Sequence, residues 1–155
     1  MKNYCYKPIG IVHSPFRSRE DIDPERNTRS RGFLNITGEL EIFKKYEKGL
    51  NDISGFSHLI VLFAFHQSPG GRLFSKPPGE RSVKGIFATR SPHRPNPIGL
   101  TVVKLLQRDG NIIRVSGLDM VEGTPVLDIK PYTRKDRKGS IRTGYMAKWK
   151  KLGRS

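Results

Sequence analysis

The sequence has a single cysteine, no long apolar run and few acidic residues. One cysteine, Cys5, excludes an internal disulfide and a zinc site built from cysteines. The longest apolar run, residues 59–65, is far too short to span a bilayer, and the N-terminus lacks the apolar core of a signal peptide. We therefore expect a soluble, cytoplasmic protein.

Several common active-site motifs are also missing. No G-x-G-x-x-G follows a first strand and no Gly-Lys-Ser/Thr phosphate loop occurs, so a Rossmann cofactor domain is unsupported. The chain has no H-E-x-x-H and no G-x-S-x-G, and four histidines with one cysteine argue against a zinc site. We expect no bound metal.

Positive charge dominates the chain. Its 155 residues include 29 Lys or Arg against 14 Asp or Glu, a formal net charge of +15. Residues 130–155 hold ten of these basic residues and one aspartate, Asp136, together with the aromatic residues Tyr132, Tyr145 and Trp149. Interleaved basic and aromatic residues suit phosphate contact and base stacking, whereas the simpler alternative is a solubilising tail.

Short β-rich segments predict a mostly β fold. A short helix is expected over residues 46–53, and Asp109-Gly110 between two β segments is a strong hairpin signal. Strands are expected over residues 6–13, 38–43, 59–65, 86–89, 101–107, 111–117 and 126–129. Because long amphipathic helices are missing, we predict an all-β domain over residues 1–132, a closed or partly closed antiparallel barrel with one or two short helices. A basic arm follows over residues 133–155.

The segment over residues 87–100 is rich in both proline and polar donors. Three prolines within six residues, Pro92, Pro95 and Pro97, stiffen its backbone. The hydrogen-bond donors on this rigid backbone are Arg90, Ser91, His93, Arg94 and Asn96. Such a loop suits an anion or polar-ligand site, since little entropy is lost on binding. The alternative is a structural turn with solvated arginines.

Carboxylates gather in residues 117–132. Asp119 and Glu122 flank a turn, and Asp128 lies in the strand that follows. Burying an aspartate is costly unless a cation pairs with it, so a structural salt bridge, with Lys130 for example, is the favoured role of Asp128. Carboxylates in this segment would also accept ribose hydroxyls or an amino group.

Two histidines bracket the apolar strand over residues 59–65. Side chains at strand ends often face the mouth of a barrel, which favours a functional role for His66 and Gln67. We expect His58, at the other end, to be structural.

These segments together resemble the TsaA-like, TrmO-type tRNA methyltransferase family. The resemblance covers residues 8–132 and is carried by the strings I-G-I-V-H-S-P-F, G-F-S-H-L, F-A-F-H-Q, G-I-F-A-T-R-S-P-H-R-P-N-P-I-G-L and L-D-M-V-E-G-T-P-V-L-D-I-K-P-Y. It implies a single-sheeted β-barrel, a homodimer and S-adenosylmethionine as cofactor. The implied reaction is N6-methylation of N6-threonylcarbamoyladenosine, next to the anticodon in the anticodon loop of tRNA.

The resemblance also implies site residues. The expected cofactor contacts are Pro24, Glu25, Arg26, His66, Gln67, Arg90, Leu100, Asp119, Met120, Val121 and Glu122. The expected substrate contacts are His93, Arg94, Asn96, Lys130 and Tyr132. Residues 24–26 depart from the family's Pro-Arg-Gln, and the basic arm stands where larger bacterial members carry an extra C-terminal domain.

Methyl transfer from a sulfonium needs two positioned reactants and no covalent nucleophile. Loss of the acceptor's proton should help, and Asp119, Glu122 and His66 are the candidate bases. Two alternatives remain: a non-catalytic RNA-binding barrel, and a hydrolase that uses His66 or His93. The methyltransferase hypothesis requires that Arg90 and Asp119 share one cavity.

Overall fold

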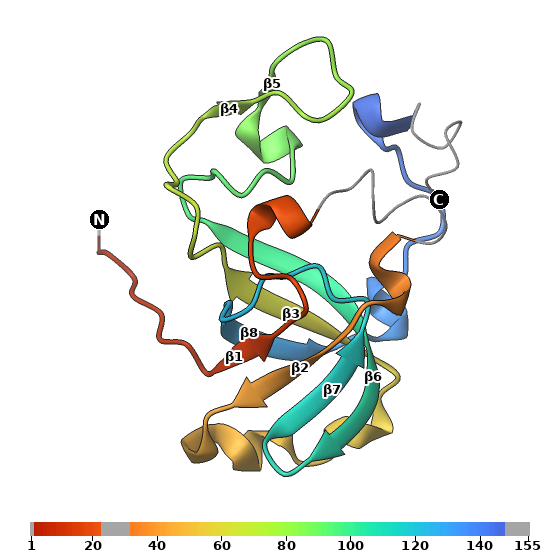
Figure 1. Cartoon of the computed structure of the whole chain (residues 1–155). Coiled ribbons are helices and arrows are strands. Elements are labelled where there is room, and N and C mark those ends of the chain that lie inside the picture. The colour runs from red at the N-terminus through yellow and green to blue at the C-terminus, as the bar shows by residue number, and fades with distance from the viewer. Residues whose placement is uncertain (1, 23–31, 148–155) are drawn as a thin grey trace.

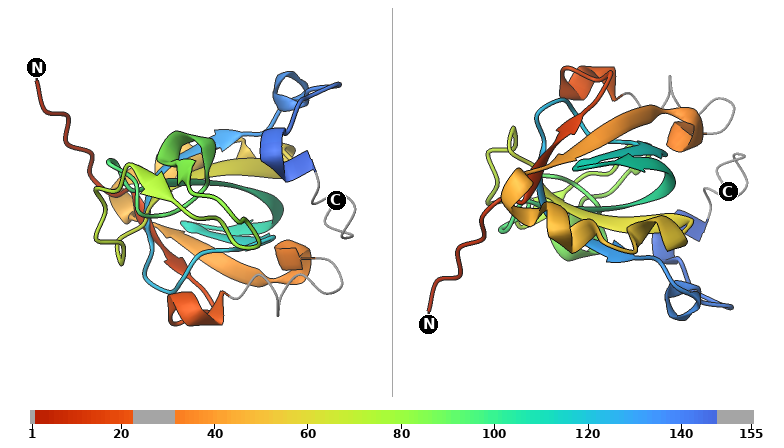
Figure 2. Two further views of the ribbon diagram at one scale, coloured as in Figure 1. Left: turned by 90° about the horizontal axis from the view of Figure 1, so that it is seen from above. Right: turned by 90° about the horizontal axis from the view of Figure 1, so that it is seen from below.

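A closed antiparallel barrel forms the body of the protein (Figures 1 and 2). The computed structural model describes residues 2–22 and 32–147. The barrel strands follow the order β1-β2-β7-β6-β3-β8, with β8 pairing back to β1. They are β1 (Gly10–His13), β2 (Thr37–Ile42), β3 (His58–Ala64), β6 (Ile98–Asp109), β7 (Ile112–Ser116) and β8 (Pro125–Pro131). The prediction of an antiparallel barrel is confirmed.

The helices of the described residues are short 3₁₀ turns. They are η1 (Arg19–Asp21), η2 (Gly32–Asn35), η3 (Lys44–Leu50), η4 (Ile53–Gly55), η5 (Ile86–Ala88) and η6 (Arg134–Asp136), with a further 3₁₀ turn over residues 144–147. The helix expected over 46–53 corresponds to η3 and the start of η4. The strand expected over 86–89 is wrong, because η5 lies there. The backbone N–H and hydroxyl of Thr89 both donate to the Ile86 carbonyl, which closes a local turn in place of a strand ladder.

The predicted hairpin at Asp109-Gly110 joins β6 to β7. Gly110 has a φ of +56°, a conformation that favours glycine, and Asp109 pairs with Ile112 across the turn. The side-chain amide of Asn111 donates to the Ile42 carbonyl at 2.7 Å. This bond fixes the hairpin to the end of β2.

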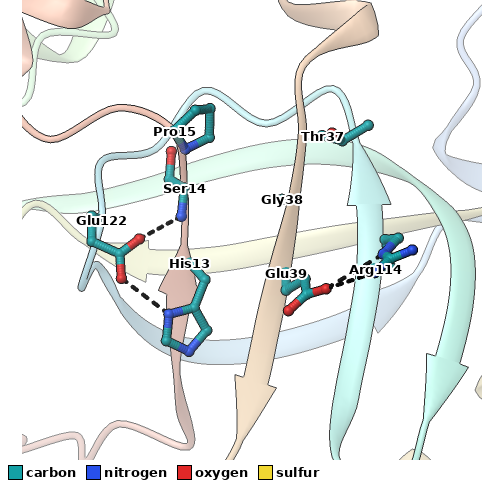
Figure 3. A pocket seen from close by; sticks show the side chains of 8 residues that line it. All are labelled: His13, Ser14, Pro15, Thr37, Gly38, Glu39, Arg114 and Glu122. Carbon is teal, nitrogen blue, oxygen red and sulfur yellow. Dashed lines mark hydrogen bonds and ion pairs between the residues drawn. The ribbon is translucent and has the colours of Figure 1, made fainter.

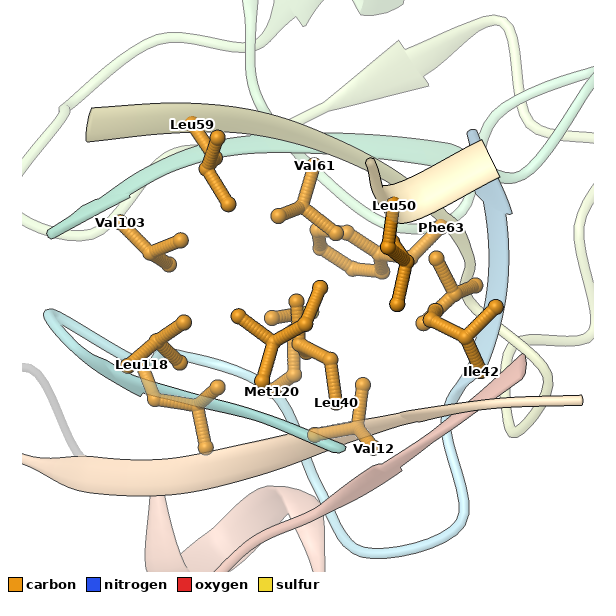
Figure 4. Close-up of a cluster of buried hydrophobic side chains, with 13 residues drawn as sticks. Val12, Leu40, Ile42, Leu50, Leu59, Val61, Phe63, Val103, Leu118 and Met120 are labelled. Carbon is orange, nitrogen blue, oxygen red and sulfur yellow. The ribbon is translucent and has the colours of Figure 1, made fainter. Parts of the chain in front are cut away.

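Aliphatic side chains fill the barrel interior (Figure 4). Along β3 the buried positions alternate, so that Leu59, Val61 and Phe63 point inward. The buried cluster consists of Val12, Leu40, Ile42, Leu50, Leu59, Val61, Phe63, Val103, Ile113, Val115, Leu118, Met120 and Val126. Each buried aliphatic side chain contributes roughly 1.5–3 kcal/mol as an upper estimate. A filled interior places a ligand site at an end of the barrel.

The long connection over residues 65–97 rises from one end of the barrel (Figure 1). It carries η5 and a separate two-stranded sheet, β4 (Phe74–Ser75) with β5 (Lys84–Gly85). It leaves from β3 and returns into β6, where Gly99 pairs with Phe63. Any Cβ at Gly99 would overlap the Phe63 ring, so glycine is required for this close approach.

Within residues 2–22 and 32–147, no helix has the length and apolar character needed to cross a membrane. The carboxylate of Asp128 pairs with the Lys130 ammonium at 2.5 Å on β8. The structural salt bridge favoured for Asp128 is therefore present.

Candidate active site

A cavity of about 720 Å³ lies between the barrel end and the connection over residues 65–97. Three separate segments line it: the exit of β3 with His66 and Gln67, the loop that carries Arg90, and the turn that carries Asp119. Arg90 and Asp119 therefore share one cavity, as the methyltransferase hypothesis requires. Its volume is in the range typical of small-molecule sites.

Part of the cavity wall is apolar. The Phe63 and Phe65 rings pack edge to face with centroids 5.1 Å apart, and both line the cavity. Met120 is 1 % exposed and lines it as well, next to Val121. Apolar walls with a few polar groups are typical of cofactor sites.

Asp119 lines the cavity with a largely buried carboxyl group. Its Oδ1 atom is buried and has no hydrogen-bond partner among the described residues. Burial raises the pKa of Asp119 above its ordinary value, while a hydrogen bond with Thr101 and the charge of Arg90 act in the opposite direction. Buried polar atoms without partners are rare because each costs stability. This oxygen is therefore placed to accept a hydrogen bond from a ligand.

Hydrogen bonds fix the loop that carries Arg90. The Arg94 guanidinium donates from Nη1 to the Thr89 carbonyl at 2.8 Å and to the Ser91 carbonyl at 3.4 Å. The Ser68 hydroxyl donates to the Pro92 carbonyl at 3.0 Å. Arg94 is thus engaged with its own loop, outside the cavity lining, and it positions Arg90 instead of facing a ligand.

His93 lines the cavity as a neutral imidazole between cations. Its Nε2 accepts from Arg19 Nη1 at 2.8 Å, and its Nδ1 lies 2.8 Å from the Ser68 hydroxyl oxygen. Desolvation and the charges of Arg19 and Arg72 lower the pKa of His93. Two guanidinium groups beside a neutral ring form a positive rim suited to an anion.

Glu122 lies outside this cavity, although it belongs to the same turn as Asp119. Its carboxylate accepts from the Ser14 backbone N–H at 2.6 Å and contacts His13 Nδ1 at 3.0 Å (Figure 3). His13 Nε2 lies 2.7 Å from Glu41, so both ring nitrogens face carboxylates. These groups raise the pKa of His13, whereas hydrogen bonding lowers the pKa of Glu122.

His13 and Glu122 belong to a second, open hollow of about 620 Å³, which also contains the ion pair of Glu39 with Arg114 (Figure 3). The Glu122 carboxylate thus joins the turn to the segment after β1. The contact of Glu122 with His13 was not predicted from the sequence. No local pattern indicates a contact between residues 109 positions apart.

Other expected contacts also lie away from the cavity. Leu100 is 51 % exposed on the outer face of β6, and Asn96 is exposed. Lys130 pairs with Asp128 on β8, and the Tyr132 ring packs edge-on to His58. Pro24, Glu25 and Arg26 fall outside the described residues.

Four further residues, none of them expected from the sequence, line the cavity. Arg19 and Glu20 of η1 line one part of the wall. Tyr145 and Met146 reach the cavity from the C-terminal arm. The aromatic residues of the arm were the signal in the sequence, but their position depends on tertiary structure.

Known proteins resemble this chain over most of its length. The family model of the tRNA-methyltransferase O N-terminal domain matches residues 11–136. A probable S-adenosyl-L-methionine-binding protein of Pyrococcus abyssi is 42% identical over 145 residues, which are 93% of this chain and 77% of that protein. The human tRNA (adenine(37)-N6)-methyltransferase is 43% identical over 137 residues, 84% of this chain but 30% of the human protein.

A solved structure gives the same result. The crystal structure of TrmO from Pseudomonas aeruginosa superposes with a TM-score of 0.74 and 32% sequence identity, covering 93% of this chain and 63% of that one. The chain thus spans less than two thirds of that structure and of the human enzyme. With its barrel and its matched residues, the chain belongs to the tRNA-methyltransferase O N-terminal domain family.

Proposed function

We propose that this chain is an S-adenosylmethionine-dependent methyltransferase that acts on N6 of an adenine in tRNA, at position 37 beside the anticodon. The observation that carries the proposal is the cavity in which Arg90 faces the same space as Asp119 Oδ1, which no described residue engages in a hydrogen bond. Relatives named for this cofactor and this reaction support it.

The residues of the cavity suit this cofactor. The Arg90 guanidinium would bind its carboxylate, and Asp119 Oδ1 would accept a hydrogen bond from a ribose hydroxyl or an amino group. The apolar wall of Phe63, Phe65 and Met120 suits the adenine ring. When bound, the cofactor supplies an electrophilic methyl group. The chain contributes orientation and the exclusion of water.

A base on the cavity wall would take the proton that leaves N6. Of the three candidates, His66 and Asp119 line the cavity, whereas Glu122 is engaged by Ser14 and His13. The raised pKa of Asp119 makes its carboxylate a stronger base than an ordinary one. Substituting each residue identifies the base, because its variant loses more kcat than the change in cofactor affinity explains.

We further propose that the target adenine already carries a threonylcarbamoyl group on N6. That group has a free carboxylate, and the guanidinium groups of Arg19 and Arg72, beside the neutral His93 ring, provide cations for it. A carbamoyl substituent also acidifies the N6 hydrogen. Parallel reactions with tRNA that has or lacks the group test this: only the modified tRNA should gain a methyl group.

The reaction itself is tested with purified chain, methyl-labelled cofactor and bulk tRNA, followed by mass spectrometry of the nucleosides. We expect one new methylated adenosine, strongly reduced in the Arg90→Ala variant. A chain that binds tRNA equally well with or without Arg90 and transfers no methyl group would support the non-catalytic RNA-binding alternative.

We also propose a cytoplasmic homodimer in which the outer face of β6 is covered. Leu100 lies on this face with Ile98, Val102 and Leu106, each at least 40% exposed. A covered apolar strip is more stable than one exposed to water. Light scattering should give a dimer mass for the wild type and a monomer mass for Leu100→Glu. A monomeric wild type would contradict this part of the proposal.

A further inference from the structure

The C-terminal arm returns to the cavity after η6. Tyr145 and Met146 line the same space as Arg90 and Asp119. Both lie beyond residues 11–136, the part that the family model matches. In Figure 1 the last described turn of the arm lies above the barrel, at the level of the connection that carries β4 and β5. This part of the wall is therefore supplied by the arm and not by the matched domain.

Two contacts hold the Tyr145 ring in place. Its hydroxyl donates to the carbonyl of Ala88, the last residue of η5, at 3.1 Å. The Lys84 ammonium lies 5.2 Å from the ring centroid, within the range of a cation–π contact. Ala88 lies two residues before Arg90, so the ring is tied to the loop that presents the guanidinium.

The chemistry around Tyr145 favours RNA as its ligand. Between residues 134 and 142 the arm carries Arg134, Lys135, Arg137, Lys138 and Arg142, with Asp136 as the one acidic residue. Basic side chains next to an aromatic ring combine phosphate contact with base stacking. The groups suited to the cofactor, Arg90 and Asp119, instead belong to the matched domain.

We propose that Tyr145 is the stacking surface for the target base, which the basic arm delivers to the cavity. The proposal rests on the proposed function and names the residue that recognises the nucleobase. A base that leaves an RNA loop loses its stacked neighbours, and an aromatic side chain replaces them. Met146 adds apolar contact beside the ring.

Kinetics of the full chain test the assignment. Tyr145→Ala should lower kcat/KM for tRNA roughly tenfold, since stacking on an aromatic ring is lost, while cofactor affinity changes less than threefold. Tyr145→Phe keeps the ring and should stay within about threefold of the wild type. Tyr4→Ala, an exposed tyrosine near the N-terminus, is the matched control and should leave both quantities unchanged.

Two results would overturn the assignment. One is unchanged kcat/KM in Tyr145→Ala. The other is a loss of cofactor affinity as large as the loss of kcat/KM, which would make Tyr145 part of the cofactor site.

A second measurement separates the stacking assignment from the proposed function. An anticodon stem-loop RNA with 2-aminopurine at the target position should lose fluorescence on binding the wild type and keep it on binding Tyr145→Ala. If the wild type transfers no methyl group, the proposed function fails, and this fluorescence difference still decides whether Tyr145 stacks on the base. Equal quenching by both proteins would overturn the stacking assignment.

Discussion

Burial raises the pKa of the Asp119 carboxyl, and the positive charge of the Arg90 guanidinium acts in the opposite direction. The two side chains come from different connections of the barrel and line one cavity, where the Asp119 Oδ1 atom has no hydrogen-bond partner among the described residues. The buried Asp119 Oδ1 atom lowers the stability of the ligand-free fold. Together with the Arg90 cation it can bind the opposite charges of a zwitterionic ligand. This balance leads to the first two predictions.

Arg90→Ala should weaken cofactor binding roughly tenfold to a hundredfold, because one charged hydrogen-bond donor is lost. The melting temperature should not change, since the side chain is exposed on the cavity wall. Calorimetry and thermal unfolding measure the two effects. Arg94→Ala is the matched contrast: it removes bonds to the Thr89 and Ser91 carbonyls and should lower the melting temperature. A collapsed thermal transition in Arg90→Ala would make Arg90 structural.

Asp119→Asn should leave the ligand-free protein at least as stable as the wild type at pH 7. The folded pKa of Asp119 is raised, so the wild type loses stability as pH rises from about 4 through that folded value, and asparagine removes the loss. Denaturant unfolding from pH 4 to 7 measures the effect, with the exposed Asp109→Asn as control. Cofactor affinity should fall in the same variant. A less stable Asp119→Asn protein would show that the charged carboxylate supports the fold.

His13→Gln should remove a pH-dependent part of the stability. The folded pKa of His13 is raised by Glu41 and Glu122, so the stabilisation is complete below about pH 6.5 and is lost as pH rises through the folded value. The groups are partly exposed, and the effect should be about 0.5–1 kcal/mol. Unfolding between pH 6 and 9 measures it.

The matched control for His13 is His58→Gln, whose ring contacts the Ser57 hydroxyl in place of a carboxylate. The contribution of Glu122 to stability depends on pH in the opposite direction. Its folded pKa is lowered, so its contribution is present above about pH 4.5 and is lost as pH falls through the folded value. Identical pH profiles of stability for the wild type and His13→Gln would show that the contacts of His13 with Glu41 and Glu122 do not stabilise the fold.

Gly99→Ala should destabilise the protein by about 1–3 kcal/mol, since a Cβ at this position overlaps the Phe63 ring. Phe63 also lines the cavity, so cofactor affinity should fall with stability. Gly85→Ala is the control, because a Cβ there meets nothing within 4 Å. Denaturant midpoints give the comparison, and equal midpoints for the two variants would show that the ring moves aside freely.

Removal of the arm after residue 132 should flatten the salt dependence of tRNA binding. Residues 133–155 carry nine Lys or Arg and one Asp. Each lost phosphate contact lowers the slope of log K against log salt by about 0.7–0.9. A control with Lys45→Gln and Lys48→Gln, on η3 at the opposite end of the barrel (Figure 1), should keep the slope. An unchanged slope in the truncated chain would assign the solubilising role to the arm.

The sequence predicted the features that depend on local pattern. The hairpin at Asp109-Gly110 and the strand expected over residues 59–65 are both set by neighbouring residues, and both are confirmed. The expected strand over residues 86–89 failed because Thr89 closes a turn onto the Ile86 carbonyl. A short apolar segment is compatible with either a strand or a 3₁₀ turn, so the sequence pattern alone does not distinguish them.

For the site as well, the sequence indicated which segments carry functional residues but not which side chains face the cavity. Asp119 and Glu122 lie three residues apart in one turn, yet one carboxylate lines the cavity and the other contacts Ser14 and His13. That choice depends on contacts more than a hundred residues apart in the chain, and no local spacing encodes it. The entry of Tyr145 into the cavity is set in the same way, by its bond to the Ala88 carbonyl.

Titration calorimetry with S-adenosylmethionine tests the central claim most directly, on the wild type and on Arg90→Ala and Asp119→Asn. We predict one binding site per chain in the wild type, with affinity reduced in both variants while their folds persist. Absence of binding heat in the wild type at millimolar cofactor, or equal affinity in all three proteins, would contradict it.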